Sequence, residues 1–153
     1  MKKTKLKYKA YSDCSTSDNF KYYEYFYEWF ISQKGCDERF EIDKDLLVKG
    51  NRIYSENTCI LLPKEINLAL SVKKSQRGQY LIGVRKSDKK FLAGCRTGTG
   101  ERRLGTYNTE IEAFNAYKQA KENYLKQLAE KWKDQIDERA YNALMNYQVE
   151  ITD

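Results

Sequence analysis

The net positive charge of the chain lies in one quarter of the sequence. Residues 71–107 contain ten Lys or Arg residues and two acidic ones, a local net charge of +8, whereas the whole chain of 153 residues carries +6. Ammonium and guanidinium groups at this density can neutralise phosphates and release counterions, which gives nucleic-acid affinity that falls steeply with salt. The same charge also suits a solvated surface, so the arrangement of the residues must decide between the two.

Imidazole chemistry is absent. The chain has no histidine, and its cysteines form no Cys-x-x-Cys pair: they are Cys14, Cys36, Cys59 and Cys95. Structural zinc sites draw their ligands from these two residue types at short spacing, and histidine is the commonest general base near neutral pH. We therefore expect free thiols, and any catalysis must use other groups.

The basic segment has the pattern of three short strands. The candidates are Tyr80–Arg85, Phe91–Arg96 and Arg102–Tyr107, and they are divided by Ser87–Lys89 and Thr97–Gly100. Both connections have the length of hairpin loops, which predicts an antiparallel sheet.

A helix follows this sheet. Thr109 and Glu112 have the spacing of a capping box. Mostly small residues then recur at helical spacing, namely Ala113, Ala116, Tyr117, Ala120 and Tyr124. Small side chains allow close contact, so this face is expected to lie on the sheet.

Alternation along each strand separates a helix side from an outer side. In the third strand, Leu104 takes the helix side and both Arg103 and Gly105 the other. Placing the apolar set on the helix leaves four basic residues outside, with Gly83 and Gly94 between them; they are Arg85, Lys90, Arg96 and Arg103. Arginine can bond a guanine edge or clamp a phosphate, and a β-ribbon fits the major groove. Together with the neighbouring Arg102, these residues are our candidates for DNA contact.

The stretches GVRKSDKKFLAGCR and ERRLGTYNTEIEAFNAYKQA resemble the APETALA2-type (ethylene-response-factor) DNA-binding domain over about residues 80–124. The shared signatures are Gly83-Val84-Arg85, Leu104-Gly105-Thr106-Tyr107, and Glu112-Ala113 followed by Ala116-Tyr117. The resemblance implies a three-stranded sheet laid in the major groove of double-stranded DNA. The tryptophans that plant domains often carry on this sheet are absent, so no base preference is carried over.

The remainder predicts an α+β chain. Phe20, Tyr23, Tyr27 and Phe30 recur at helical spacing after Asp18 or Asn19 as N-cap, and we expect this aromatic stripe to join the core. Phe40–Val48 and Thr58–Leu62 predict strands, and Pro63 opens a short helix that reaches Leu70. Asp137–Tyr147 predicts a final amphipathic helix. Domain boundaries are expected to give regions 1–70, 71–128 and 129–153.

Residues of the N-terminal half resemble phage HNH homing endonucleases that carry an APETALA2-type domain at the C-terminus. The similarity runs through Ile42-Asp43-Lys44-Asp45 and Tyr54–Cys59 to Pro63 and Asn67. Such nucleases hold one divalent metal on a strand, loop, strand and helix unit, with a histidine base. By position, the resemblance implies Asp43 and Asn67 as ligands of Mg²⁺, Lys44 in place of the base, and Asn57 or Thr58 near the middle Asn. It also implies a phage-encoded protein in the cytoplasm of a bacterial host.

Lys44 is the departure from this pattern. A lysine with an ordinary pKa of about 10.4 is protonated at neutral pH, cannot take a proton from water, and repels a metal ion. Asp45 is the candidate substitute base. Two functions stay open: an HNH-type nicking endonuclease, and a non-catalytic descendant such as an anti-CRISPR protein that binds a CRISPR nuclease or its guide complex. No run of roughly 18 apolar residues occurs, so no membrane partner is expected.

Overall fold

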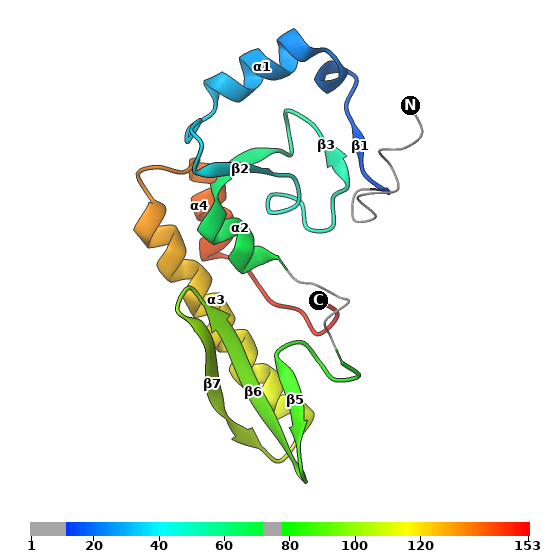
Figure 1. Ribbon diagram of the computed structural model, residues 1–153, viewed down its shortest axis with the longest axis vertical. Helices are drawn as coiled ribbons and strands as arrows, with labels where there is room; N and C mark the ends of the chain where they lie inside the picture. Colours follow the sequence, from blue (N-terminus) through cyan, green and yellow to red (C-terminus); the bar gives the residue numbers. More distant parts are fainter. Residues whose placement is uncertain (1–11, 72–77) are drawn as a thin grey trace.

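One long helix joins a three-stranded sheet to a second unit of strands and helices, and the α+β prediction is confirmed (Figure 1). The computed structural model describes residues 12–71 and 78–153. The elements in chain order are β1 (Ser15–Thr16), the 3₁₀ helix η2 (Asn19–Lys21), α1 (Tyr23–Ser32), β2 (Phe40–Asp43), β3 (Ile53–Tyr54), β4 (Ile60–Pro63), α2 (Lys64–Leu70), β5 (Val84–Ser87), β6 (Lys90–Thr97), β7 (Gly100–Tyr107), α3 (Glu110–Trp132) and α4 (Glu138–Met145).

The N-terminal half contains the predicted order of strand, loop, strand and helix. β2 and β4 pair antiparallel, with Phe40 opposite Pro63 and Asp43 opposite Ile60. α2 begins directly after Pro63, whose fixed φ suits a helix start. The first strand ends at Asp43, earlier than the predicted Val48, because the Asp43 carboxylate accepts hydrogen bonds from the next backbone N–H groups and turns the chain.

The sheet of β5, β6 and β7 is antiparallel in that order, as predicted. Its first strand begins at Val84 and not at Tyr80. Gly83 has a φ of +74°, and the Val84 N–H donates to Leu81 O, so a turn occupies the residues before the strand. The capping box of Thr109 and Glu112 is present at the start of α3.

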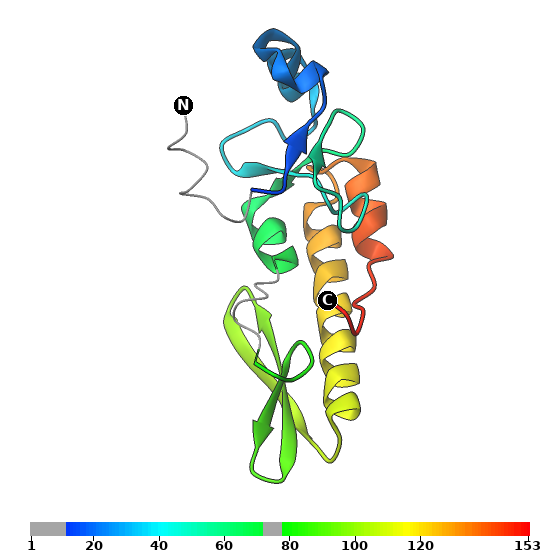
Figure 2. The same cartoon turned by 90° about the vertical axis from the view of Figure 1, so that its right-hand side faces the viewer.

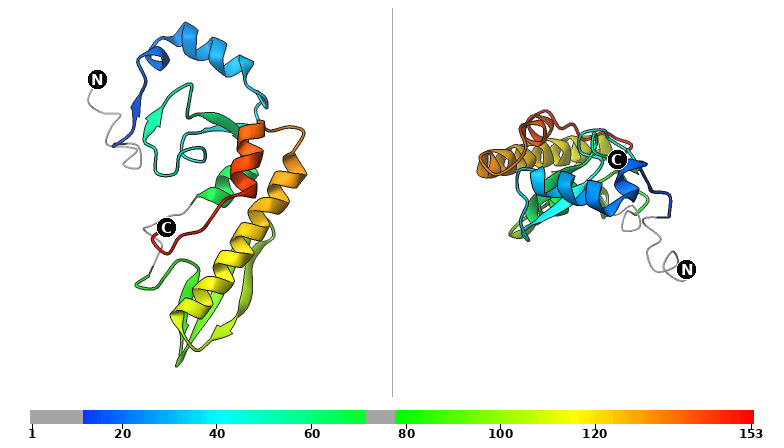
Figure 3. Two further views of the ribbon diagram at one scale, coloured as in Figure 1. Left: turned by 180° about the vertical axis from the view of Figure 1, so that it is seen from behind. Right: turned by 90° about the horizontal axis from the view of Figure 1, so that it is seen from above.

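The sheet covers one side of the N-terminal half of α3, and α4 lies beside the other half of that helix (Figures 2 and 3). Two hydrophobic clusters follow this arrangement. Ala113, Phe114 and Tyr117 of α3 belong to the cluster under the sheet. Leu125 and Leu128 belong to the larger cluster with β4, α2 and α4. Because both clusters include residues of α3, apolar packing continues across residue 128, where a domain boundary was predicted.

The end of the chain returns to the sheet. Val149 is buried in the cluster under the sheet, and Tyr147 packs against both clusters. Two side chains of α3 hold this segment by its backbone: Lys118 Nζ donates to Val149 O at 2.6 Å, and the Val149 N–H donates to Glu122 Oε1 at 2.9 Å. Residues after α4 therefore contribute to the hydrophobic packing under the sheet.

The aromatic helix α1 departs from the prediction. None of its residues is buried, and Tyr23 and Tyr27 stay 72% and 50% exposed. Phe20 packs locally on Trp29, with ring centroids 4.8 Å apart, and Phe30 alone of the predicted stripe reaches the larger core. The expectation that the whole stripe joins the core is wrong. The helix is capped by Tyr22 instead of Asp18 or Asn19, because a 3₁₀ turn occupies Asn19–Lys21.

Candidate nucleic-acid interface

Strand pairing determines which side chains share the outer face of the sheet. Arg85 lies opposite Leu92, and Leu92 opposite Thr106. The same face continues along β6 through Gly94 and its partner Arg103. The four predicted residues thus lie together on it, and all are exposed: Arg85, Lys90, Arg96 and Arg103. α3 covers the opposite face, and no described element covers this one (Figure 2).

A β-bulge in β7 sets this arrangement. Ala93 pairs with Gly105 but Gly94 pairs with Arg103, so Leu104 is an extra residue. Gly105 consequently lies on the helix side, contrary to the simple alternation expected from the sequence. Arg103 and Thr106 now share the outer face, and Arg103 Nη2 donates to Thr106 Oγ1 at 2.9 Å.

An ion pair crosses the outer face above the central strand. Arg85 Nη2 on β5 donates to Glu101 Oε1 on β7 at 2.6 Å. Gly94 of β6 lies beneath the pair, since a Cβ added there would come within 2.8 Å of Glu101 Oε1. Gly94 is on the predicted face, but the space above it holds side chains of this chain. Glu101 was not singled out in the sequence because only strand register brings it beside Arg85.

Gly83 packs closely against α3, on the other side of the sheet. A Cβ added to Gly83 would lie 2.1 Å from the ring of Tyr117 on α3. This glycine permits close packing of the helix and does not clear the outer face, so that part of the prediction is wrong.

Arg102 is separated from the four outward basic residues. It pairs with the buried Cys95 and lines a hollow with Tyr124 and Gln127 of α3, which places it on the helix side. Lys86 also lies on that side, where its Nζ sits 4.0 Å from the centroid of the Phe91 ring. Lys73, Lys74 and Arg77 lie outside the described residues.

In the N-terminal unit, Asp43 is buried within its own turn. Its Oδ1 accepts hydrogen bonds from the Asp45 N–H at 3.1 Å and the Leu46 N–H at 2.7 Å. Burial raises the pKa of the Asp43 carboxyl to about 6, partly offset by the Leu46 N–H. Lys44 Nζ lies 3.3 Å from Asp45 Oδ2 and above the ring of Tyr54. An ammonium group therefore stands beside the Asp45 carboxylate.

The other residues implied by the HNH resemblance engage different partners. Asn67 Nδ2 donates to Glu41 Oε2 at 2.6 Å, and Asn57 is exposed in the turn between β3 and β4. Magnesium requires several oxygen ligands in near-octahedral geometry. Within residues 12–71 and 78–153, no three His, Cys, Asp or Glu side chains are grouped to hold a metal ion. The hydrogen bonds of Asp43 and Asn67 go to different partners, and none of them joins these two residues.

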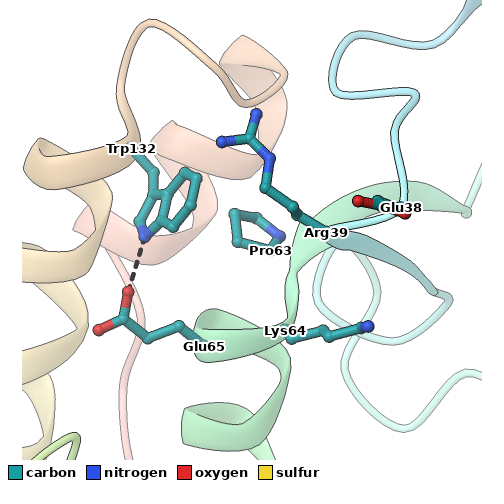
Figure 4. Close-up of a pocket in the computed structure, with 6 residues that line it drawn as sticks. All are labelled: Glu38, Arg39, Pro63, Lys64, Glu65 and Trp132. Atoms are coloured by element: carbon teal, nitrogen blue, oxygen red, sulfur yellow. Dashed lines mark hydrogen bonds between the residues drawn. The ribbon is translucent and has the colours of Figure 1, made fainter.

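A small hollow lies where α2 meets the end of α3 (Figure 4). Trp132 Nε1 donates to Glu65 Oε2 at 2.9 Å, and Lys131 Nζ donates to the same oxygen at 2.6 Å. These hydrogen bonds lower the pKa of Glu65. Arg39 and Lys64 line the rim. The contacts of Glu65 fasten α2 to α3, which gives this region a structural role.

Comparisons of the chain with protein families, with curated proteins and with solved structures found no match. Among the described helices, none is both long and apolar enough to cross a membrane. The open basic face of the sheet, to which all three strands contribute, is the feature from which a function can be proposed.

Proposed function

We propose that this chain binds double-stranded DNA with the outer face of its three-stranded sheet. The observation that carries the proposal is the convergence of basic side chains from all three strands on a face that no described element covers. These side chains, called the basic set below, are Arg85, Lys90, Arg96 and Arg103.

The geometry of the face suits the major groove, which is about 12 Å wide and admits a β-ribbon. Each strand contributes at least one long basic side chain, while α3 packs behind them and keeps the strands in register. Side chains on a sheet are held more firmly than those on a loop, which favours a fixed orientation on the duplex. The charge supplies affinity, and the sheet supplies orientation.

The proposed function is DNA binding without cleavage. The groups that the HNH resemblance implies for catalysis are engaged within the chain, Asp43 with its own turn and Asn67 with Glu41. Lys44 brings a positive charge beside Asp45, the candidate substitute base. Binding alone accounts for the open basic face.

The test is a titration of a labelled duplex with the full chain at several salt concentrations. Lys90→Ala, Arg96→Ala and Arg103→Ala should each weaken binding, and the salt slope should fall by about one for each phosphate contact removed. Lys126→Ala, an exposed change on α3, is the matched control and should leave both quantities unchanged. Binding that is indifferent to all three changes would refute the proposed face.

A further inference from the structure

Glu101 is an acidic side chain in the middle of a basic face. Strand pairing puts it directly opposite Arg96, and a hydrogen bond joins it to Arg85 on the far side of β6. A carboxylate in this position repels phosphate. It therefore works against the electrostatic attraction that the rest of the face provides.

The pair of Arg85 and Glu101 is built into the sheet. It spans from β5 to β7 across the central strand, and Gly94 beneath it leaves room for the carboxylate, since a Cβ there would come within 2.8 Å of Glu101 Oε1. Stability is a poor explanation for the pair, since exposed ion pairs contribute little to folding. Both side chains are more than a third exposed, so a ligand on this face can reach them.

The chemistry of the pair matches the edge of a base pair. Arginine has five N–H donors in a rigid fork, and Glu101 engages one of the terminal nitrogens of Arg85. The remaining donors can bond O6 and N7 of guanine, while a carboxylate can accept from N4 of cytosine. A G·C pair presents both partners together in the major groove. A phosphate offers no donor to satisfy the carboxylate.

We propose that Glu101, paired with Arg85 above Gly94, is a specificity-determining residue that makes the sheet prefer duplexes with a G·C pair facing this ion pair. The inference rests on the proposed DNA-binding function. Glu101 acts by lowering affinity for arbitrary duplexes while sparing those whose base edge satisfies it, because specificity is a difference between two affinities.

The test begins with the full chain and a library of random duplexes, from which bound sequences are selected. One position should retain a G·C pair, with roughly 5- to 100-fold weaker binding when that pair is replaced. Glu101→Gln should bind arbitrary duplexes more tightly and lose the preference at this position. Arg85→Lys should lose the preference at the same position, because an ammonium group cannot make the bidentate contact.

Two further variants separate geometry from charge. Gly94→Ala keeps every charge but forces the Glu101 carboxylate to move, so the preference should fall while the salt slope stays the same. Asp88→Asn removes one negative charge from the turn between β5 and β6, where a φ of +51° is well tolerated by asparagine. This control should tighten binding to all duplexes and keep the preference. Thermal melting confirms that each variant is folded.

Several outcomes would overturn the inference. If Glu101→Gln keeps the preference and behaves like Asp88→Asn, Glu101 contributes charge alone. If the unaltered chain binds with a steep salt dependence but selects no G·C position, the inference fails and the proposed function stands. If the chain binds no duplex at any salt concentration, both are refuted.

Discussion

The two halves of this molecule differ in how the polar side chains of their predicted sites are placed. In the sheet unit, β5 to β7 with α3, the basic set points away from the core and stays exposed. In the strand, loop, strand and helix unit, Asp43 bonds its own turn and Asn67 bonds Glu41. Residue type and position in the sequence therefore do not by themselves show whether the side chains of a predicted site come together in the fold.

The largest effect that distinguishes the two units is expected at their glycines. Gly83→Ala should destabilise the chain by about 3 kcal/mol or more, because it combines a positive φ with a collision against Tyr117. Gly50, with a φ of +78° and nothing within 4 Å of an added Cβ, is the matched control in the other unit. Gly50→Ala should cost about 1 kcal/mol. Equal losses in urea unfolding would contradict the close packing of Gly83 on α3.

The next largest effect should come from removing three positive charges, either from the outer face of the sheet or from exposed positions elsewhere. A triple change of Lys90, Arg96 and Arg103 to alanine should weaken binding to a duplex by on the order of 100-fold at low salt. The same three charges can be removed elsewhere by changing the exposed residues Lys34, Lys64 and Lys126 to alanine. That control should alter affinity by less than about threefold, since distant exposed charges are screened. Equal losses in the two triple variants would mean that net charge, and not the sheet face, controls binding.

Asp43 gives a smaller effect that depends on pH. Burial raises the pKa of its carboxyl to about 6 from 3.8, so the folded chain holds this proton more tightly than the unfolded chain does. Its contribution to stability is complete below about pH 4 and is lost as the pH rises to about 6. Asp43→Asn keeps an oxygen acceptor without the charge. It should be more stable than the original chain by about 3 kcal/mol at pH 8 and about equally stable at pH 4.

Urea unfolding at both pH values measures this difference, with the exposed Asp134→Asn as a control that should show none. An Asp43→Asn variant that is less stable at pH 8 would show that the ionised carboxylate is needed by its turn. That result would restore a role for the negative charge in the N-terminal unit.

The smallest expected effect is on DNA integrity. Supercoiled DNA incubated with the full chain and Mg²⁺ or Mn²⁺ should remain uncut, because Asp43 and Asn67 have other partners and Lys44 opposes a cation. Agarose electrophoresis against an incubation without metal provides the measurement. Nicking that disappears in Asp43→Ala would contradict this expectation and assign catalysis to the N-terminal unit.

Local signals in the sequence were sufficient for much of this architecture. The capping box of Thr109, the sheet-facing residues Ala113 and Tyr117, and the outward set of basic residues all follow from spacing within one segment. The features that were missed depend on contacts between segments. The bulge at Leu104 moves Gly105 to the helix side, and register alone brings Glu101 to Arg85.

The exposure of α1 was missed for a related reason. Helical spacing predicts which side chains share a face, but it does not say whether another element covers that face. Phe20 and Trp29 contact each other within the N-terminal segment with tilted rings, and Tyr23 and Tyr27 stay exposed. Asp43 was likewise placed correctly on its strand while its engagement with Leu46 N–H could not be inferred from residue type.

The continuous helix α3 has a consequence for how the molecule unfolds. Its 23 residues supply side chains to both hydrophobic clusters, and Lys118 and Glu122 hold Val149 against the sheet. Unfolding of the whole helix would therefore weaken both clusters, which should couple them in one cooperative transition with similar amide-exchange protection along the middle of the helix. The sheet that we propose as the DNA-binding surface is then not expected to fold when cut out of the chain, because α3 and the segment around Val149 contribute to its packing.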